Sequence, residues 1–133
     1  MNYSPRGKPF RMTLGDRGEI IAANFLIEKG YRIAEKNYRC RLGEVDLIAE
    51  KAGRLVFFEV KTRANRHFGR HEESVHLAKQ RKIVRLAQWY LKEKRITGAR
   101  AGFGVVAVTW RGSGDPDIRL IDDAFSADEE QDR

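Results

Sequence analysis

Apolar residues recur with helical spacing in two stretches of the chain and with strand-like alternation in five others. The first helix should begin near Asp16, where Asp16 and Glu19 stand at the spacing of a capping box, and should end at Gly30. The second helix should span Leu77–Lys94. The strands are expected at Tyr31–Tyr38, Glu44–Glu50, Leu55–Thr62, Phe103–Thr109 and Asp117–Ile121.

This order of elements predicts one α/β domain, built on a mixed β-sheet of about five strands flanked by helices. The first three strands should form a meander, with 31–38 near an edge and 55–62, which is apolar on both faces, in the centre. The second helix then acts as a crossover, so the fourth strand can run parallel to the third. Alternation within 44–50 places Val45, Leu47 and Ala49 on one face and Glu44, Asp46 and Ile48 on the other.

Length and composition agree with a single soluble domain. The chain has 133 residues, of which 41% are hydrophobic, and its longest apolar stretches, such as Leu55–Phe58, are four residues long. A membrane-spanning helix needs roughly 20. The single cysteine, Cys40, has no intrachain partner for a disulfide, which favours a reducing compartment. We therefore expect a cytoplasmic protein that does not enter the membrane.

Positive charge is concentrated in the body of the chain. The net charge is +7, and because residues 122–133 carry −5, the rest carries +12. We expect residues 1–13 to be a basic flexible arm, 14–125 the folded domain and 126–133 an acidic disordered tail. The basic body favours a polyanion such as nucleic acid, although a solvated surface without a partner is the alternative. The candidate nucleic-acid-binding side chains are Arg39, Arg41, Arg63, Arg66, Arg70, Lys79, Arg81 and Lys82.

Three charged residues form the strongest candidate for chemistry. Glu59 and Lys61 lie two apart on one strand and project from the same face, and a short hairpin folds Asp46 back toward Glu59. Two carboxylates beside a lysine suit a hard divalent cation, Mg²⁺ or Mn²⁺, with Asp46 and Glu59 as ligands. Lys61 would then orient a water molecule or stabilise charge that develops on a phosphate. A structural ion pair on a half-exposed strand is the alternative.

Other side chains could join this centre. Glu19 would add a third metal ligand if its helix packs on the same sheet face, although it would also serve the capping box. Glu44 shares the face of Asp46, but an exposed position beside the turn is the alternative. Gln80 leads the apolar stripe of the second helix and should lie beside the active site. The aromatic residues that could either stack on bases or fill the core are Trp89, Tyr90 and Trp110.

Short motifs along the chain resemble those of the YraN family of bacterial proteins. In order they are Gly18-Glu19, Asn37-Tyr38-Arg39, Gly43-Glu44-Val45-Asp46-Leu47-Ile48-Ala49, Phe57-Phe58-Glu59-Val60-Lys61-Thr62-Arg63, Phe68-Gly69 and Lys79-Gln80-Arg81-Lys82. The resemblance covers about residues 14–122. The YraN family in turn resembles the PD-(D/E)xK nucleases, which share the restriction-endonuclease-like fold, and among them the archaeal Holliday-junction resolvases.

This resemblance implies a role for each candidate. Asp46 takes the place of the first aspartate of the nuclease motif, and Glu59 and Lys61 that of the (D/E)xK pair. Glu19 matches the glutamate of the first helix, and Gln80 matches the polar residue in the second helix of many such nucleases. The resolvase likeness also implies a homodimer.

Two positions depart from the pattern. Val45 stands where the nuclease motif has a proline, and Gly104 follows Phe103 where the family usually has an aspartate. The predicted metal-binding triad itself is complete. The sequence therefore favours a metal-dependent endonuclease that hydrolyses phosphodiesters in DNA, including branched or structured DNA. The alternatives are a catalytically silent nucleic-acid-binding module or accessory factor in DNA processing, and a protein-interaction domain.

Overall fold

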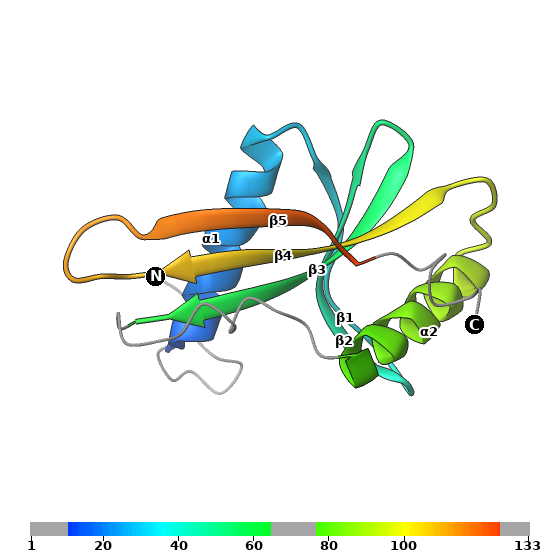
Figure 1. The fold of residues 1–133 in the computed structure, drawn as a ribbon, viewed down its shortest axis with the longest axis horizontal. Coiled ribbons are helices and arrows are strands. Elements are labelled where there is room, and N and C mark those ends of the chain that lie inside the picture. The colour runs from blue at the N-terminus through cyan, green and yellow to red at the C-terminus, as the bar shows by residue number, and fades with distance from the viewer. Residues whose placement is uncertain (1–10, 65–76, 126–133) are drawn as a thin grey trace.

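The computed structural model describes residues 11–64 and 77–125 of the chain. These residues form two helices and five strands, and all the strands belong to one open sheet (Figure 1). In chain order the elements are α1 (Leu14–Glu28), β1 (Arg32–Cys40), β2 (Gly43–Lys51), β3 (Arg54–Arg63), α2 (Leu77–Glu93), β4 (Arg100–Thr109) and β5 (Asp117–Phe125). Most of the predicted arm and all of the predicted tail lie outside the described residues.

The strands are ordered β1-β2-β3-β4-β5 across the sheet. The first three form an antiparallel meander, β4 runs parallel to β3, and β5 returns antiparallel to β4. The parallel step follows from the long connection through α2. The predicted mixed α/β fold is confirmed, with β1 at an edge and β3 in the centre. Neither described helix is long and apolar enough to cross a membrane.

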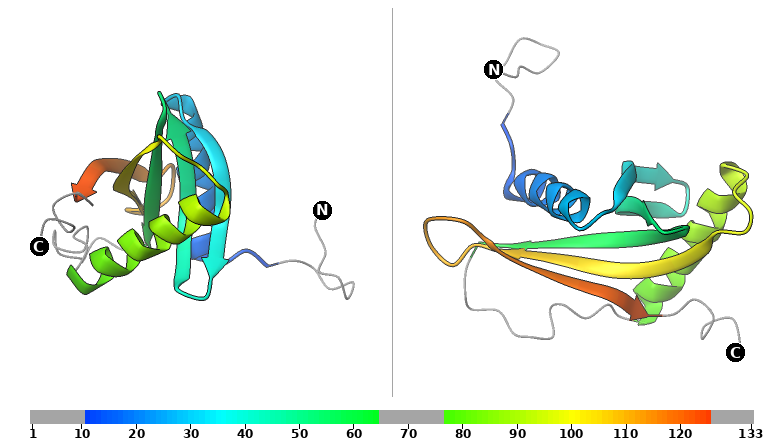
Figure 2. Two further views of the ribbon diagram at one scale, coloured as in Figure 1. Left: turned by 90° about the vertical axis from the view of Figure 1, so that its right-hand side faces the viewer. Right: turned by 90° about the horizontal axis from the view of Figure 1, so that it is seen from above.

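Strand β3 is buried on both faces because its alternating side chains enter two separate cores. Val56 and Phe58 pack with the buried residues of α1, whereas Leu55 and Phe57 pack with those of α2. The two helices therefore cover opposite faces of the sheet. In Figure 1, α1 lies behind β4 and β5 and α2 lies beside β1 and β2, and Figure 2 shows both helices from the side and from above.

Helix α1 begins earlier than its sequence pattern predicts. The Thr13 hydroxyl accepts the N–H of Asp16 and the Asp16 carboxylate accepts the N–H of Thr13, both at 3.0 Å. The predicted capping box of Asp16 with Glu19 is therefore wrong, because Asp16 already closes the box with Thr13. The predicted end at Gly30 is confirmed: φ is 98°, and its N–H donates to Ile27 O at 3.0 Å. Glu19 is left to serve another role.

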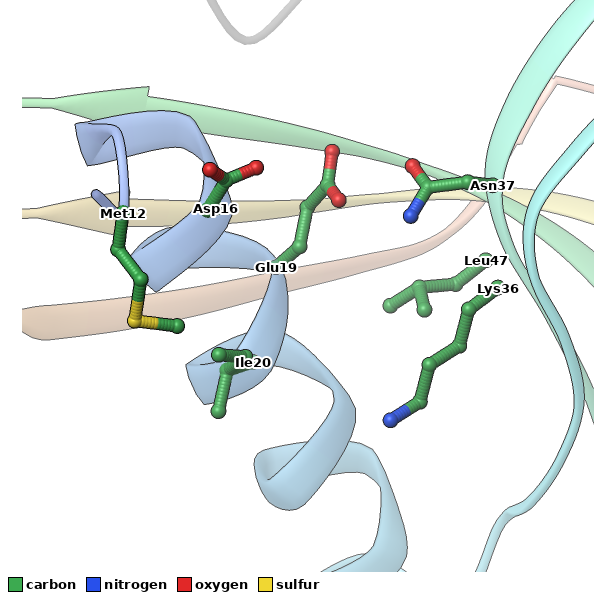
Figure 3. A pocket seen from close by; sticks show the side chains of 7 residues that line it. All are labelled: Met12, Asp16, Glu19, Ile20, Lys36, Asn37 and Leu47. Atoms are coloured by element: carbon green, nitrogen blue, oxygen red, sulfur yellow. The ribbon is translucent and has the colours of Figure 1, made fainter. Parts of the chain in front are cut away.

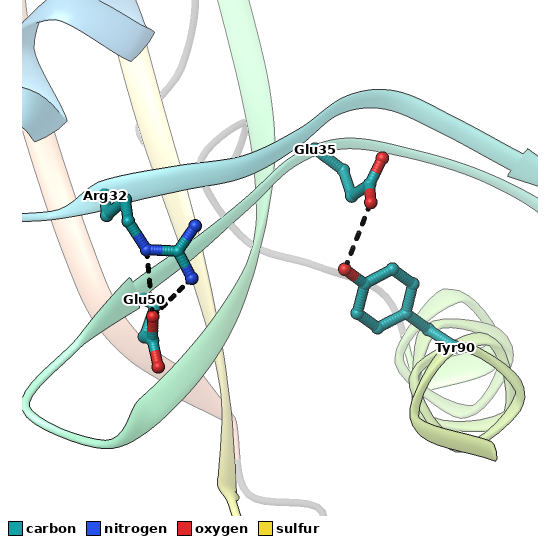
Figure 4. A network of polar contacts seen from close by, with 4 residues as sticks. All are labelled: Arg32, Glu35, Glu50 and Tyr90. Atoms are coloured by element: carbon teal, nitrogen blue, oxygen red, sulfur yellow. Dashed lines mark hydrogen bonds and ion pairs between the residues drawn. The ribbon is translucent and has the colours of Figure 1, made fainter. Parts of the chain in front are cut away.

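Helix α2 is tied to the edge strand β1 by two tyrosine–glutamate hydrogen bonds. The Tyr90 hydroxyl donates to Glu35 Oε2 at 3.3 Å, and the Tyr38 hydroxyl donates to Glu93 Oε1 at 2.6 Å. Burial, assisted by the Glu35 charge, raises the pKa of Tyr90 to about 12, so the phenol remains a donor at neutral pH. Figure 4 shows the Tyr90–Glu35 bond. It also shows the exposed pairing of Arg32 with Glu50 across β1 and β2.

Gly104, one of the two departures from the family pattern, has a packing reason. It pairs with Phe58 across β3 and β4. A Cβ at Gly104 would lie 2.6 Å from the Phe58 ring and 2.9 Å from the Ile121 carbonyl oxygen. An aspartate therefore does not fit this position while Phe58 fills the α1 core.

We expect Gly18→Ala to destabilise the protein. A Cβ at Gly18 would overlap Thr62 Oγ1 and lie 3.0 Å from Thr62 Cβ, so rotation of the threonine side chain makes no room. Overpacking of this kind lowers the free energy of unfolding by about 1–3 kcal/mol, which exceeds the helix propensity that alanine adds. Urea denaturation measures the difference.

Gly15→Ala is the matched control in the same helix. A Cβ at Gly15 meets nothing nearer than Thr13 Oγ1 at 3.7 Å, so this variant should be neutral or slightly stabilised. The double variant Gly18→Ala/Thr62→Ala removes Oγ1 and Cγ2 but keeps Cβ, so it should recover part of the lost stability. Equal stability of the Gly15 and Gly18 variants would contradict the packing of α1 on β3.

Candidate functional site

Strands β2 and β3 part at Asp46. Their pairing runs from the hairpin to Leu47–Phe58, and a continued register would set Asp46 against Glu59. Asp46 Oδ2 instead accepts a hydrogen bond from the N–H of Val60 at 2.8 Å. A strand N–H lies in the plane of its sheet, so the Asp46 carboxylate lies between the two strands rather than above either face.

The backbone is irregular in β2 next to Asp46 and in β1 across from it. The predicted alternation sets Val45 with Leu47 and Ala49, but Val45 packs in the α2 core while the other two pack in the α1 core. That prediction is wrong for Val45 because β2 changes its alternation where Asp46 turns toward β3. On β1, across from Asp46, Asn37 adopts a left-handed φ of 52°.

Glu59 lies between two ammonium groups. It projects from β3 on the face that α2 covers, two residues after Phe57, and its side chain is 14% exposed. Lys61 Nζ, two residues further on, lies 3.6 Å from Glu59 Oε2. Lys79 Nζ, from the first turn of α2, forms an ion pair with Glu59 Oε1. Glu59 and Lys61 lie side by side as predicted, and Lys79 is a further neighbour of Glu59.

Glu59 Oε2 is buried, yet it accepts no hydrogen bond from the described residues. The 3.6 Å contact with Lys61 is too long to be one. A buried carboxylate oxygen without a hydrogen bond is unfavourable, so it is a suitable ligand for a cation. Within residues 11–64 and 77–125, no three His, Cys, Asp or Glu side chains gather as a metal-binding group. A metal here would therefore depend on Asp46, Glu59 and water, as is common for Mg²⁺.

A pocket of about 180 Å³ opens at this pair of carboxylates. It offers the volume of about six water molecules at roughly 30 Å³ each, enough for a hydrated ion or a phosphate group. Strands β2 and β3 and helix α2 all contribute to its wall. The lining residues are Glu44, Val45, Asp46, Glu59, Lys79 and Ile83.

Negative charge is crowded around Asp46. Burial raises the pKa of Asp46 above its ordinary value of 3.8, and the hydrogen bond from Val60 opposes that shift. The charges of Glu59 and Glu44 raise this pKa further, while Lys79 lowers it. A bound cation would relieve the same repulsion.

Glu19 lines a second pocket rather than the first (Figure 3). It accepts a hydrogen bond from the Asn37 side chain, and its pKa is raised by burial first and then by the charge of Asp46. Glu19 is thus within electrostatic reach of Asp46, and its role as a metal ligand stays a prediction. The second pocket, of about 200 Å³, is lined by Met12, Asp16, Glu19, Ile20, Lys36, Asn37 and Leu47.

Helix α2 brings Lys79 rather than Gln80 into the pocket wall. The sequence pattern predicts Gln80 in the active site and Lys79 only among the nucleic-acid contacts. Gln80 is partly buried in the same turn but is not a lining residue. Lys79 lies one turn before Ile83, which also lines the pocket, and this spacing of four is the signal that could have identified it.

Besides Lys79, two of the predicted nucleic-acid-binding side chains lie near residues that line the pocket or adjoin them. Arg39 Nε lies 3.4 Å from Glu44 Oε1, and the Lys82 side chain passes close over Gly43, the first residue of β2 after the β1–β2 turn. Arg41, in the same turn, is exposed. Arg63 is partly buried and Arg81 exposed, whereas Arg66 and Arg70 lie outside the described residues.

The sequence also matches a family model, described as "Uncharacterised protein family UPF0102", over residues 18–108. The matched range includes most of α1, all of α2 and the residues that line the pocket at Asp46. The chain belongs to this family. The resemblance to the YraN family is thereby confirmed.

UPF0102 proteins from several bacteria match this chain over most of its length. The protein from Syntrophus aciditrophicus (strain SB) is 45% identical over 120 residues, which cover 87% of this chain and 94% of the relative. The protein from Syntrophotalea carbinolica is 42% identical over 118 residues, covering 89% and 95%. Among solved structures, Pyrococcus furiosus SfsA in complex with Ca²⁺ is similar with a TM-score of 0.38 and 17% identity. That match covers 81% of this chain but 61% of SfsA, and the family assignment rests on the sequence matches alone.

We expect Asp46→Asn to stabilise the metal-free UPF0102 protein at neutral pH. Because folding raises the pKa of Asp46, the folded state holds the proton more tightly, and the ionised carboxylate opposes folding above that pKa. The penalty disappears as the pH falls below the unfolded-state value, so the gain from asparagine should be largest near pH 7 and shrink toward about pH 4. Urea denaturation in chelator across this range measures it.

Asp115→Asn removes one negative charge at an exposed position and serves as the control. It should change the free energy of unfolding little at either pH. If Asp46→Asn instead lowered stability by a few kcal/mol at neutral pH, Asp46 would be one half of a buried ion pair.

Proposed function

We propose that this protein is a metal-dependent endonuclease that hydrolyses phosphodiester bonds in DNA. The observation that carries the proposal is Glu59 Oε2, a buried carboxylate oxygen that accepts no hydrogen bond from the described residues, in a pocket shared with Asp46. Carboxylates from two adjacent strands, beside two lysines, form a suitable centre for a cation and a phosphate. The resemblance to PD-(D/E)xK nucleases supports the same assignment for Asp46, Glu59 and Lys61.

Mg²⁺ or Mn²⁺ would be held by Asp46 and Glu59. Asp46 Oδ2 accepts a hydrogen bond from the N–H of Val60, which orients the carboxylate, and no residue in the described part of the chain donates one to Glu59 Oε2. Glu19 would add a third carboxylate from the second pocket, and Glu44 lines the first. When bound, such an ion neutralises phosphate charge and lowers the pKa of a coordinated water molecule.

The two lysines would bind and orient the reacting groups. Lys61 is held on the central strand beside Glu59, where its ammonium could orient a water molecule or stabilise charge on the phosphate. Lys79 lies at the start of α2 and lines the pocket, so it would contact the phosphate directly. Gln80 in the same turn would support that end of the substrate.

A catalytically silent DNA-binding module is the second candidate. The observation that favours it is the pair of ammonium groups at Glu59, because Lys61 and Lys79 already compensate its charge. In that case the pocket would be structural, and the surrounding basic residues alone would bind DNA. The preference for branched DNA and the homodimer are proposals that come from the resolvase likeness.

Metal binding separates the two candidates. Mg²⁺ or Mn²⁺ should raise the melting temperature of the parent protein, because a ligand that binds only the folded state stabilises it by mass action. Asp46→Asn and Glu59→Gln should remove most of this shift, and with it cleavage of duplex, flap or four-way-junction DNA. Thermal denaturation with and without chelator, followed by gel assays on those substrates, measures both effects.

Lys79→Met tests whether the Lys79 ammonium competes with a metal ion for Glu59. It removes the ammonium from Glu59 Oε1, so the metal-induced shift should increase while the protein stays folded. A parent protein without any metal-induced shift, and a Lys79→Met variant equally indifferent to metal, would establish the silent module.

DNA binding should weaken steeply as salt rises. Each phosphate contact to duplex DNA contributes about 0.9 to the slope of log affinity against log salt. The variant Arg39→Gln/Lys82→Gln removes two charges beside the pocket and should lower the slope by about 1.8. Fluorescence anisotropy between about 50 and 200 mM salt measures it.

Arg32→Gln/Lys51→Gln is the control for net charge. These residues lie at the opposite end of β1 and β2 from Asp46, so the slope should stay at the parent value. A flat salt dependence of the parent protein would favour the protein-interaction domain over both DNA-binding candidates.

A further inference from the structure

The outward face of α2 carries a continuous basic stripe that contains a tryptophan. Lys82, Arg85, Trp89 and Lys92 recur at spacings of three and four, so they lie along one side of the helix, and all are exposed. The helix has no acidic residue before Glu93, its last residue. We call these four residues, together with Arg41, the α2 stripe.

Arg41 joins the stripe from the β1–β2 turn. Its guanidinium lies 5.8 Å from the centre of the Trp89 ring, which is within reach of a cation–π interaction. The turn lies close against α2, since a Cβ at Gly43 would lie 2.8 Å from Lys82 Cε. Trp89 is 37% exposed, so part of its ring is accessible to a partner.

The stripe begins at the candidate active site. Lys79, in the first turn of α2, lines the pocket that contains Asp46 and Glu59. From Lys79 to Lys92 the helix extends about 20 Å at 1.5 Å per residue. A strand that leaves the pocket could therefore follow the stripe.

We infer that the α2 stripe binds an unpaired nucleic-acid strand adjacent to the pocket. This inference rests on the proposed function and adds to it the form of the substrate: a single-stranded segment, as in a flap or an open junction arm. The basic side chains would contact successive phosphates, and Trp89 would stack on a base. In a duplex both faces of each base are covered by neighbouring bases, so an accessible indole beside an arginine matches an unpaired base better.

Binding of a twelve-nucleotide oligothymidylate in chelator tests the inference without any cleavage. The chain has two tryptophans, so Trp110→Phe leaves Trp89 as the sole indole reporter. Its fluorescence should be quenched on binding. Trp89→Leu should weaken affinity about tenfold, whereas Trp89→Phe, which keeps an aromatic face, should retain most of it.

The basic part of the stripe has its own test. Arg85→Gln/Lys92→Gln should lower the salt slope for the oligonucleotide by about 1.4, since each contact to a single strand contributes about 0.7. Arg32→Gln/Lys51→Gln should leave that slope unchanged. Equal affinity of the parent and Trp89→Leu proteins, or stronger binding of duplex than of single strand with no quenching, would overturn the inference.

These experiments can reject either proposal without the other. A parent protein that metal does not stabilise, but that binds the oligonucleotide through Trp89, would reject the endonuclease and keep the single-strand surface. A normal metal response with oligonucleotide binding that ignores Trp89 would reject the surface and keep the endonuclease.

Discussion

The hydrogen bond from Val60 N–H to Asp46 Oδ2 is the interaction on which the rest of the site depends. A buried backbone N–H without a hydrogen-bond acceptor costs about 1–3 kcal/mol, so where two strands part inside a sheet another group must accept the hydrogen bond. The Asp46 side chain accepts it from Val60, and β2 and β3 separate beyond Leu47 and Phe58. The same bond orients the Asp46 carboxylate and opens the pocket beside Glu59.

Because Asp46 lies between the strands, it connects the electrostatics of both sheet faces. Its charge interacts with Glu59 on the α2 side and with Glu19 on the α1 side, and the pKa values of Asp46 and Glu19 are both raised. Burial is the first cause in each case, and repulsion between carboxylates adds to it. A folded state that collects negative charge in this way is stabilised by any cation the site admits.

The sequence predicted the elements well because helices and strands differ in their repeat, and it failed where one side chain decides the local geometry. Thr13 caps α1 before Asp16 because its hydroxyl captures the Asp16 N–H. Val45 leaves its predicted face because Asp46 interrupts β2. Lys79 stands four residues before Ile83 and so shares its side of α2, but which sheet residues this side meets depends on how α2 crosses the sheet. The position of Asp46 beside the end of β3 was predictable, since a short hairpin fixes the register of β2 against β3.

The two lysines at Glu59 differ in how far their side chains are exposed, and this difference would link phosphate binding to the charge of the pocket. Lys61 extends from the central strand and its side chain is 20% exposed, so it stays beside Glu59. Lys79 is 50% exposed on a flexible four-carbon stem, so its ammonium can move away from Oε1 without disturbing the fold. Within residues 11–64 and 77–125, Glu59 thus has one oxygen paired with the movable Lys79 ammonium and one that accepts no hydrogen bond. A phosphate entering the pocket would attract Lys79 outward, and the charge left on Glu59 would then favour a divalent ion, which couples substrate binding to assembly of the metal centre.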